Sequence, residues 1–505
     1  MMFSQKRTRS KSLSCSDQKV IPKRTPRTRR NLEKQQRKHL ECRLFVTFVV
    51  SILLIGLVQG QYIDTINFAF KDIPQQFQNP LTGFYRFGPV QNQNVPMQPE
   101  TFPASLEFLA VPLKSVVTGP GSYSWTRFEQ DLSTVARNGR QAVVRFYVDY
   151  PGLPSGIPDF LMRGGLSARP YSENGNCASC SLLPDYSNKR LVDTLIGFIR
   201  VFGAQYNGDK RIGIVQLGLV GFWGEWHTWP LQYNAQTFPS TPVLSNIIKT
   251  YRTAFPDTLL QIGINVASLP VYNAHNEAAY LKNLSIGYSD DSIMSSYYDS
   301  FIKPILERSN TTLTYTTGII GGEIFPPVQH CLLRSPSCVG STQFLLETLK
   351  TYRASVALFQ RLFDGPLSPN EIRVAQILAK SMGYRFYISR VRVSISSGTT
   401  RLDVTVTNNG MTKCYFDLYL GLDMDHTSYF VTDRLHEVLP NVSRTFIMNI
   451  PVTRNVSRTM LPFRARFFLH APLKVMPRQY LYLSNDGINN NGDLYFIINP
   501  MKNTV

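Results

Sequence analysis

The sequence lacks several features that would point to common classes of protein. It has only seven histidines, and none of them forms the closely spaced pair that zinc hydrolases use, which argues against a metal-dependent enzyme. No stretch repeats with a fixed period, so the chain is not built as a repeat protein. Its one long apolar run, residues 44–58, is shorter than the about 20 residues of a comfortable membrane span.

Acidic residues are also scarce, with 34 Asp+Glu against 53 Lys+Arg and a net charge of +19. The excess is uneven, because residues 1–43 carry +11 and all the following residues together only +8. The folded part is therefore mildly basic, and we expect no nucleic-acid partner. Residues 1–43 show no apolar periodicity and cannot bury enough surface to fold, so we predict a disordered basic tail.

The apolar run has basic residues only on its N-terminal side, which leaves two interpretations for residues 44–60. One is a signal-anchor that contacts the membrane and keeps the tail in the cytoplasm, as in a single-pass type II membrane protein. The other is a signal peptide cleaved near Gly60, which releases a secreted protein. We favour the anchor slightly. Both interpretations place residues 61–505 in the secretory pathway, in the lumen or outside the cell.

Cysteines and glycosylation sequons agree with that compartment. The seven cysteines include two close pairs, Cys177/Cys180 and Cys331/Cys338, which indicate either two local disulfides or two cross-linked loops. A zinc site is the rival interpretation, but the second spacing is too wide for a knuckle, so disulfides are favoured. Four sequons, all beyond the apolar run, predict a glycoprotein; they begin at Asn283, Asn310, Asn441 and Asn455.

Strand-like and helix-like segments alternate from residue 105 to residue 383. Such alternation predicts a parallel sheet, and its length favours a (β/α)8 TIM-like barrel over an open sheet. Residues 61–104 are rich in Gln, Asn and Pro and are expected to form a lead-in to this domain. The pattern supports seven strands, with an eighth still to be found; they lie at 105–113, 142–150, from 212, 258–266, 284–291, 314–326 and 355–359.

From residue 384 to residue 505 the pattern changes to short alternating strands separated by turn signals such as Asn-Asn-Gly. No helical periodicity remains in this part. We therefore predict a small all-β sandwich domain after the barrel. Packing of this sandwich on the barrel is favoured over a carbohydrate-binding role.

The stretch from Ile212 to Trp229 is the centre of the predicted site. Its apolar first part is typical of a strand covered on both faces, and it ends in three tryptophans, a glutamate and a histidine. In TIM barrels the working residues follow the C-terminal ends of the strands, so polar residues at other strand ends should converge there. The candidates are Arg145, Tyr147, Trp223, Glu225, Trp226, His227, Asn265, Asp290, Asp291 and Glu323.

Glycoside cleavage needs two carboxyl groups, and Glu225 and Glu323 are the natural pair. We expect an apolar wall of tryptophan to raise the pKa of Glu225, as an acid requires, and Arg145 to keep Glu323 ionised. Trp223 and Trp226 offer flat faces to a sugar, and the other candidates offer polar contacts. Plainer interpretations remain: Arg145 as a salt-bridge partner, Asp290 and Asp291 as helix caps, and His227 as a packed residue.

Several motifs together resemble an uncharacterised family of secreted (β/α)8-barrel proteins with a C-terminal β-domain, similar to retaining glycoside hydrolases. The most specific motif is GFWGEWH; the others are NPLTGFYRF, GYSDD, GGEIFP and SMGYRFYI, spread over residues 74–500. In that superfamily the acid/base and the nucleophile follow strands four and seven. Here Glu225 and Glu323 follow predicted strands three and six, and Gly224 stands where the superfamily usually has asparagine.

The sequence thus predicts an extracytoplasmic glycoside hydrolase, retaining rather than inverting, with Glu225 as acid/base and Glu323 as nucleophile. The carbohydrate is the expected partner, and we expect no cofactor and no metal. The alternative is a catalytically silent glycan-binding or cell-surface protein on the same barrel. A metal-dependent hydrolase using Asp290, Asp291 and His227 is the weakest of the three hypotheses.

Overall fold

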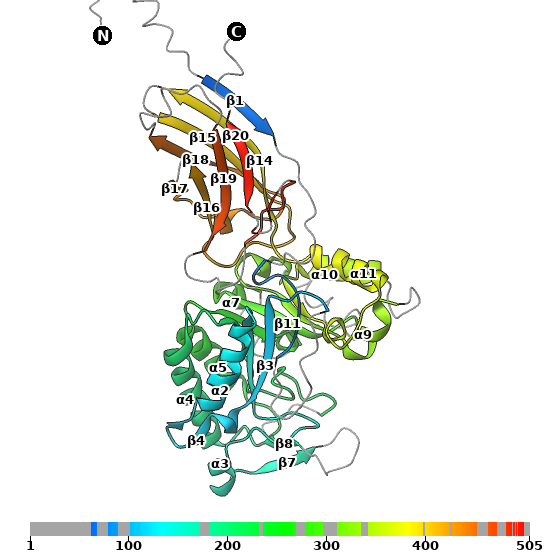
Figure 1. Cartoon of the computed structure of the whole chain (residues 1–505). Coiled ribbons are helices and arrows are strands. Elements are labelled where there is room, and N and C mark those ends of the chain that lie inside the picture. Colours follow the sequence, from blue (N-terminus) through cyan, green and yellow to red (C-terminus); the bar gives the residue numbers. More distant parts are fainter. Residues whose placement is uncertain are drawn as a thin grey trace, which may run out of the picture. The chain divides into compact units, whose positions relative to one another are not determined.

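Eight parallel strands close into a barrel in the computed structural model of the chain (Figure 1). They follow one another around the barrel in sequence order, and the last pairs with the first. They are β2 (Gly83–Phe87), β3 (Leu106–Pro112), β6 (Gln141–Tyr147), β9 (Ile212–Gln216), β10 (Leu259–Gly263), β11 (Ile286–Ile293), β12 (Gly321–Ile324) and β13 (Val356–Leu358). The structure describes residues 62–67, 79–88, 101–171, 181–231, 236–268, 278–295, 311–334, 342–396, 399–424, 427–451, 463–471, 481–486, 488–489, 491 and 493–498.

The predicted barrel is confirmed, and the strand missing from the sequence pattern is β2. This strand was expected to be part of the lead-in, but Gly83 pairs with Val356 and Arg86 with Glu107, so β2 closes the barrel between β13 and β3. It escaped detection because its five residues, GFYRF, are too few to show a period. Counting β2 as the first strand, Glu225 follows the fourth strand and Glu323 lies in the seventh.

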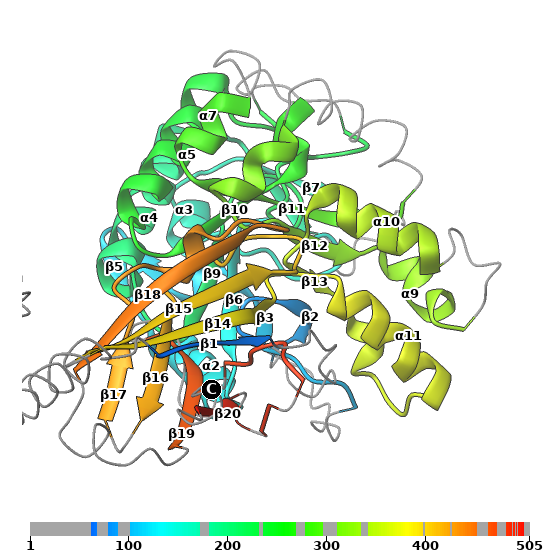
Figure 2. The ribbon, with the colours of Figure 1, turned by 90° about the horizontal axis from the view of Figure 1, so that it is seen from above.

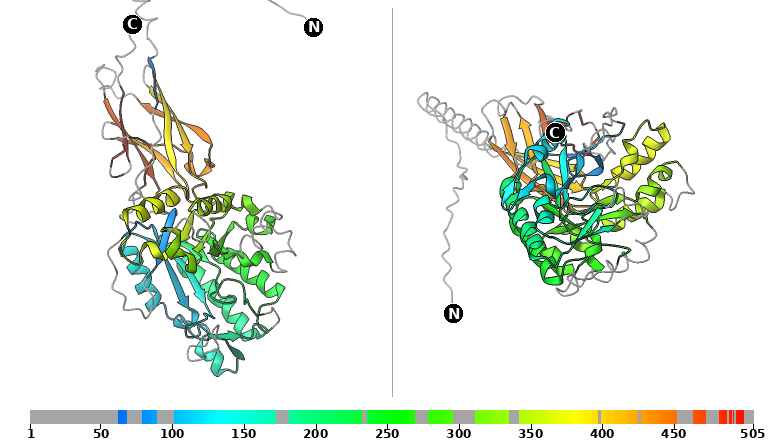
Figure 3. Two further views of the ribbon diagram at one scale, coloured as in Figure 1. Left: turned by 90° about the vertical axis from the view of Figure 1, so that its right-hand side faces the viewer. Right: turned by 90° about the horizontal axis from the view of Figure 1, so that it is seen from below.

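Helices lie outside the barrel strands, as Figure 2 shows for α4 and α5 and as both views of Figure 3 show for the helices coloured cyan to yellow. Their buried residues recur at helical spacing and pack on the outward side chains of the strands. Helix α11 (Pro369–Lys380) follows Ser368, which forms a capping box with Glu371. The helices are α2 (Thr126–Arg137), α3 (Asp159–Arg163), α4 (Lys189–Tyr206), α5 (Thr241–Ala254), α7 (Ala278–Asn283), α9 (Pro326–Leu332), α10 (Thr342–Tyr352) and α11 (Pro369–Lys380).

The barrel interior is layered. Toward the N-terminal ends of the strands it is filled by apolar side chains, among them Leu106, Val143 and Ile214. Above them Gln216 and Gln261, both buried, form a polar layer with a hydrogen bond of 3.1 Å between their amides. A packed floor of this kind supports a site only at the C-terminal ends of the strands.

Outside the barrel, two four-stranded antiparallel sheets share one hydrophobic cluster, as in the predicted sandwich. One contains β1 (Tyr62–Asn67), β14 (Phe386–Ser396), β15 (Thr399–Asn408) and β18 (Ser443–Pro451). The other contains β16 (Tyr419–Met424), β17 (Thr427–Phe430), β19 (Phe463–His470) and β20 (Leu494–Ile498). Because β1 pairs with β14, residues 62–67 belong to the sandwich and not to the barrel lead-in.

Barrel and sandwich are joined by buried polar contacts as well as by the shared apolar cluster. Asn79 exchanges two hydrogen bonds with the backbone of Tyr482, at 2.8 and 3.2 Å. The hydroxyl of Tyr415 donates to the carbonyl of Tyr315 at 2.8 Å. The sandwich therefore packs on the barrel, as the sequence favoured.

Other predictions fall partly outside the described residues. Cys177, Cys180 and Cys338 lie outside them, so the loop disulfides stay a prediction, whereas Cys414 is a buried free thiol. Of the sequons, Asn283 and Asn441 are described and exposed, and Asn310 and Asn455 are outside. The described helices include none that is long and apolar enough to cross a membrane, and the segment 44–60 is outside.

Asn408 offers a test of the sandwich. Its buried side chain accepts from the amides of Arg385 and Gly410 and donates to two carbonyls, those of Thr412 and Val438. Asn408→Ala leaves all four groups unpaired, so we expect the free energy of unfolding to fall by about 2–4 kcal/mol. Chemical denaturation measures this. The neighbouring Asn409 has an exposed side chain, so Asn409→Ala is the control and should change stability by less than about 0.5 kcal/mol.

Candidate active site

The loop after β9 folds back tightly on itself. Its residues Leu219, Gly221, Trp223, Gly224 and Trp226 all have positive φ, a conformation that costs energy for residues other than glycine. Backbone hydrogen bonds hold the loop, from the Phe222 amide to the His227 carbonyl at 2.8 Å and from the Trp226 amide to the Val220 carbonyl at 3.1 Å. Strained non-glycine backbone that is held this firmly is typical of a functional site.

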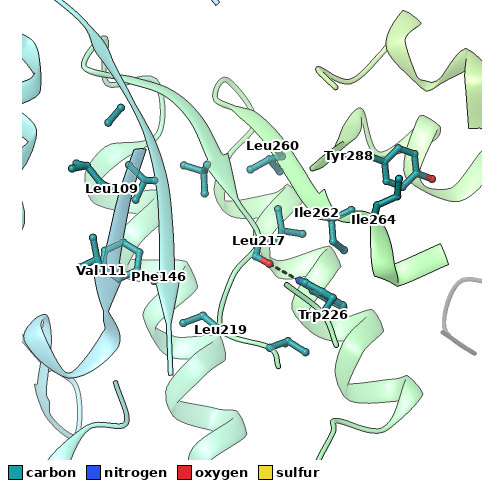
Figure 4. Close-up of a cluster of buried hydrophobic side chains, with 14 of the residues drawn as sticks. Leu109, Val111, Phe146, Leu217, Leu219, Trp226, Leu260, Ile262, Ile264 and Tyr288 are labelled. Atoms are coloured by element: carbon teal, nitrogen blue, oxygen red, sulfur yellow. Dashed lines mark hydrogen bonds between the residues drawn. The ribbon is translucent and has the colours of Figure 1, made fainter. Parts of the chain in front are cut away.

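Trp226 anchors this loop in the core and does not face the pocket. Its side chain is fully buried, and its indole N–H donates to the carbonyl of Leu217 (Figure 4). Figure 4 shows the indole among Leu217, Ile262 and Ile264. The expectation that Trp226 offers a flat face to a sugar is therefore wrong for this structure. Alternating positive-φ residues send Trp223 and Trp226 in different directions, which spacing alone did not reveal.

The backbone of Glu225 lies directly against β10. A Cβ atom at Gly263 would stand 2.5 Å from the Glu225 carbonyl oxygen, so only glycine permits this approach. The side-chain amide of Asn265, just beyond β10, donates to the same carbonyl at 3.2 Å. Asn265 thus holds the backbone of Glu225, and its contact with a sugar hydroxyl stays a prediction.

Side chains from six barrel strands and from the loops after β6 and β9 line one pocket at the C-terminal ends of the strands. The predicted residues Arg145, Trp223, Glu225, Asp291 and Glu323 are all among them. The free space between the side chains is small, about 30 Å³, enough for roughly two water molecules. The remaining lining residues, which the sequence did not suggest, are Tyr85, Phe87, Phe108, Tyr150 and Leu358.

Arg145, on β6, is the centre of the charged groups. Its guanidinium contacts the Asp291 carboxylate and lies 3.3 Å from Oε1 of Glu225. It also stacks over the ring of Phe108, 5.1 Å from the centroid, and only 7% of its side chain is exposed. Arg145 is therefore both the salt-bridge partner that the plainer interpretation expected and a part of the pocket wall.

Glu225 has two partners for its carboxylate. Besides Arg145, the Nε2 atom of His227 lies 3.3 Å from Oε2. The Nδ1 atom of His227 accepts from the Trp229 amide at 3.2 Å, so a neutral His227 carries its proton on Nε2 and donates it to Glu225. Burial and then the charge of Asp291 raise the pKa of Glu225, while His227 and Arg145 act in the opposite direction.

Glu323 lacks such partners. Its nearest polar contact among the described residues is the amide of Gln329, at 3.4 Å. Burial, followed by the charges of Asp291 and Glu225, raises its pKa well above the ordinary value, and Arg145 offsets only part of this. The expectation that Arg145 keeps Glu323 ionised is therefore wrong, because its guanidinium contacts Glu225 and Asp291 instead.

Asp290 and Asp291 point to opposite sides of β11, as neighbours in a strand do. Asp291 lines the pocket. Asp290 is buried outside it, where it accepts from the Tyr352 hydroxyl and, at 2.9 Å, from the Ser292 amide. Burial raises the pKa of Asp290 to about 7 in spite of these hydrogen bonds. Asp290 is thus neither a helix cap nor a substrate contact.

Asp290 and His227 therefore do not gather around Asp291 as a metal site would require. The described residues contain no group of three potential metal ligands. Tyr147 is buried next to Tyr150, with 4.9 Å between the ring centroids, and Tyr150 rather than Tyr147 reaches the pocket. Tyr85 remained hidden because β2 was missed, and its hydroxyl donates to the Gly322 carbonyl at 3.2 Å.

No protein-family model matches the sequence, and no curated protein matches it. Among solved structures, a Paenibacillus polymyxa xyloglucanase of glycoside hydrolase family 44 is similar with a TM-score of 0.32 and 10% identity, over 77% of this chain and 100% of that one. Xylanase 10B from Thermotoga maritima is similar with a TM-score of 0.34 and 14% identity, over 59% of this chain and 94% of that one. Likeness at this level carries no argument about the chemistry of this chain, which must come from its own residues.

Asp149 lies behind the loop that carries Glu225. It forms a β-bridge with Phe222, is fully buried, and neither of its carboxylate oxygens has a hydrogen-bond partner among the described residues. Burial raises its pKa to about 7. The folded state therefore binds a proton more tightly than the unfolded chain, where the pKa is about 3.9.

This shift predicts that Asp149 lowers stability as pH rises from about 4 to 7. Over that range the folded state must give up a proton that the unfolded state has already lost, at a cost of at most about 4 kcal/mol. Asp149→Asn should remove this loss, so its stability relative to the wild type should increase with pH. Unfolding measured from pH 4 to 8 tests this, with Asp159→Asn, at an exposed carboxylate, as the control. A constant difference between Asp149→Asn and wild type would contradict it.

Proposed function

We propose that this protein is a glycoside hydrolase whose catalytic pair is Glu225 and Glu323. The observation that carries the proposal is that both glutamates, one after the fourth strand and one in the seventh, lie in one pocket. The oppositely charged side chains of Arg145 and Asp291 line the same pocket. Two partly buried carboxyl groups with different surroundings in one pocket suit a reaction that needs an acid and a base or nucleophile. The predicted secretory segment would expose this pocket to glycans outside the cytoplasm.

The contacts of the unliganded pocket favour one division of roles. Arg145 and His227 both favour the ionised form of Glu225, whereas Glu323 has no cation in contact among the described residues. Glu323 is therefore the better proton donor and Glu225 the better nucleophile or base. The resemblance to retaining hydrolases implies the reverse, with the acid after strand four. We propose the division of roles that the contacts of Glu225 and Glu323 favour. The two assignments predict different products in a rescue experiment.

Aromatic side chains on the pocket wall suit a sugar substrate. Trp223 is partly exposed and lines the pocket together with Tyr150, their rings 6.5 Å apart and nearly perpendicular. Flat apolar faces of this kind match the C–H faces of a sugar, while the carboxylates match its hydroxyl groups. The small free space means that a sugar either binds at the mouth or moves these rings aside.

One observation favours the alternative of glycan binding without turnover. Arg145 bridges Glu225 and Asp291 inside a pocket that has little free space. A buried arginine held by two carboxylates restrains both of them, and a purely structural ion pair has the same geometry. The test of the proposed function must therefore read binding and hydrolysis separately.

Replacing either glutamate by glutamine separates the two functions. Glu225→Gln and Glu323→Gln keep the size of the side chain but remove its ability to exchange a proton or attack, so we expect turnover to fall by about 10³-fold or more. Residues 61–505 incubated with a glycan array, read for both bound glycan and released sugar, measure this. Glu347→Gln, at an exposed glutamate of α10, is the control. Hydrolysis that survives in both pocket variants would refute the pair, and binding without hydrolysis in the wild type would favour the alternative.

Chemical rescue decides the roles. Both variants are given an activated aryl glycoside and azide. The alanine variant of the nucleophile then yields a glycosyl azide of inverted configuration, whereas the alanine variant of the acid/base yields a glycosyl azide of retained configuration. We expect inversion for Glu225→Ala and retention for Glu323→Ala. The reverse pattern would restore the assignment that the resemblance implies.

Trp223→Ala tests the pocket wall. Because Trp223 lines the pocket, its loss should weaken glycan binding and raise KM about tenfold, by removing one aromatic contact. Trp229, which is 71% exposed and does not line the pocket, provides the control Trp229→Ala. Equal effects of the two substitutions on KM would place the sugar elsewhere.

A further inference from the structure

Beneath the pocket, four side chains close a ring of hydrogen bonds. Arg145 donates from Nε to Oε1 of Gln216 at 2.8 Å, and Gln216 donates from Nε2 to Oγ of Ser289 at 3.0 Å. Ser289 donates to Oδ1 of Asp291 at 2.8 Å, and Arg145 returns to Oδ2 of Asp291. Each of the four comes from the inner face of the barrel, from β6, β9 and β11.

The donors and acceptors of this ring permit only one orientation of the Gln216 side-chain amide. Arg145 has no acceptor, so Oε1 and not the NH₂ group of Gln216 must face it. The NH₂ group then faces Ser289, whose single proton is left for Asp291. Asp291 therefore receives a donor on each oxygen, one of them a guanidinium, so its carboxylate is held in one place and one orientation. The remaining N–H of Gln216 is used by Gln261, at 3.1 Å.

We propose that Gln216 and Ser289 are positioning residues. They hold Asp291 as the fixed negative charge of the pocket, beside which Glu225 and Glu323 take up and release protons. Asp291 lines the pocket with both glutamates, so a charge fixed there acts on both. It also stands in place to stabilise the positive charge that develops on a sugar in glycoside cleavage. This role rests on the proposed function, whereas the ring itself does not.

The same charge explains the raised pKa values of the two glutamates. After burial, Asp291 is the largest cause that raises the pKa of Glu225 and of Glu323. A ring that keeps Asp291 charged thus keeps a proton available on one glutamate at a pH where an isolated glutamate would have lost it. Gln216 and Ser289 act only through Arg145 and Asp291, because neither lines the pocket.

The pH profile of turnover tests the proposal. Asp291→Asn removes the fixed charge, so the alkaline limb should move down by about one pH unit or more. Gln216→Leu and Ser289→Ala loosen Asp291 and weaken its effect on the glutamates, so the alkaline limb should move down by a smaller amount, and kcat/KM should fall about 10- to 100-fold. Ser289→Thr keeps the hydroxyl and should restore the profile. Gln261→Leu is the control, because Gln261 is a buried amide of the same layer that contacts neither Arg145 nor Asp291 and meets the ring only through the second N–H of Gln216.

A double-mutant cycle tests the ring without turnover. Gln216 and Asp291 have no direct hydrogen bond but are linked through both Arg145 and Ser289, so the melting temperature of the double variant should fall by less than the sum of the single losses. The cycle of Gln261 with Asp291 should be additive. Additivity in both cycles, or a pH shift in Gln261→Leu equal to that in Gln216→Leu, would overturn the proposal. If the wild type hydrolyses no glycan, the proposed function fails, and the cycle alone decides the ring.

Discussion

The site depends on one buried charge, the guanidinium of Arg145. An arginine cannot lose its proton inside a protein, so the surroundings must supply acceptors or negative charge. The fold does so by placing Gln216, Glu225 and Asp291 on three other segments around it. After burial, the charge of Asp291 raises the pKa of Glu225, and the charges of Asp291 and Glu225 raise the pKa of Glu323. The protonation pattern of the pocket therefore follows from a single arginine that has contacts with only two of the three acids.

This constraint also accounts for the glycines around Glu225. Gly224, with φ of +75°, and Gly218 both lie against the aliphatic part of Arg145, and a Cβ at either would stand 3.0–3.3 Å from it. An asparagine in place of Gly224 would need the volume that Arg145 occupies. Gly218 and Gly224 thus leave room for the aliphatic part of Arg145, whose guanidinium carries the charge around which the acids of the pocket are arranged.

Much of the fold was predictable from the sequence because apolar runs and helical periods are local signals. Seven strands were found. Strand β2 was missed because five residues carry no period and its paired residues in β3 and β13 are 21 and 273 positions away. The β1 strand was misplaced for the same reason, since only the sandwich pairing with β14 shows where it belongs. Pairing between distant segments is the part of the fold that local pattern does not encode.

The sequence was enough to predict several residues of the pocket, but not the contacts between their side chains. Strand ends named Arg145, Glu225, Asp291 and Glu323 correctly as pocket residues, because barrel topology brings all strand ends together. Which acid pairs with the arginine depends on side-chain direction: Asp291 faces the pocket while Asp290 does not, and Trp226 is buried at the end of a loop in which four earlier residues have positive φ. Direction is decided by register and loop geometry, so the sequence identified an acid pair, whereas only the structure shows that Glu323 is the member without a cation.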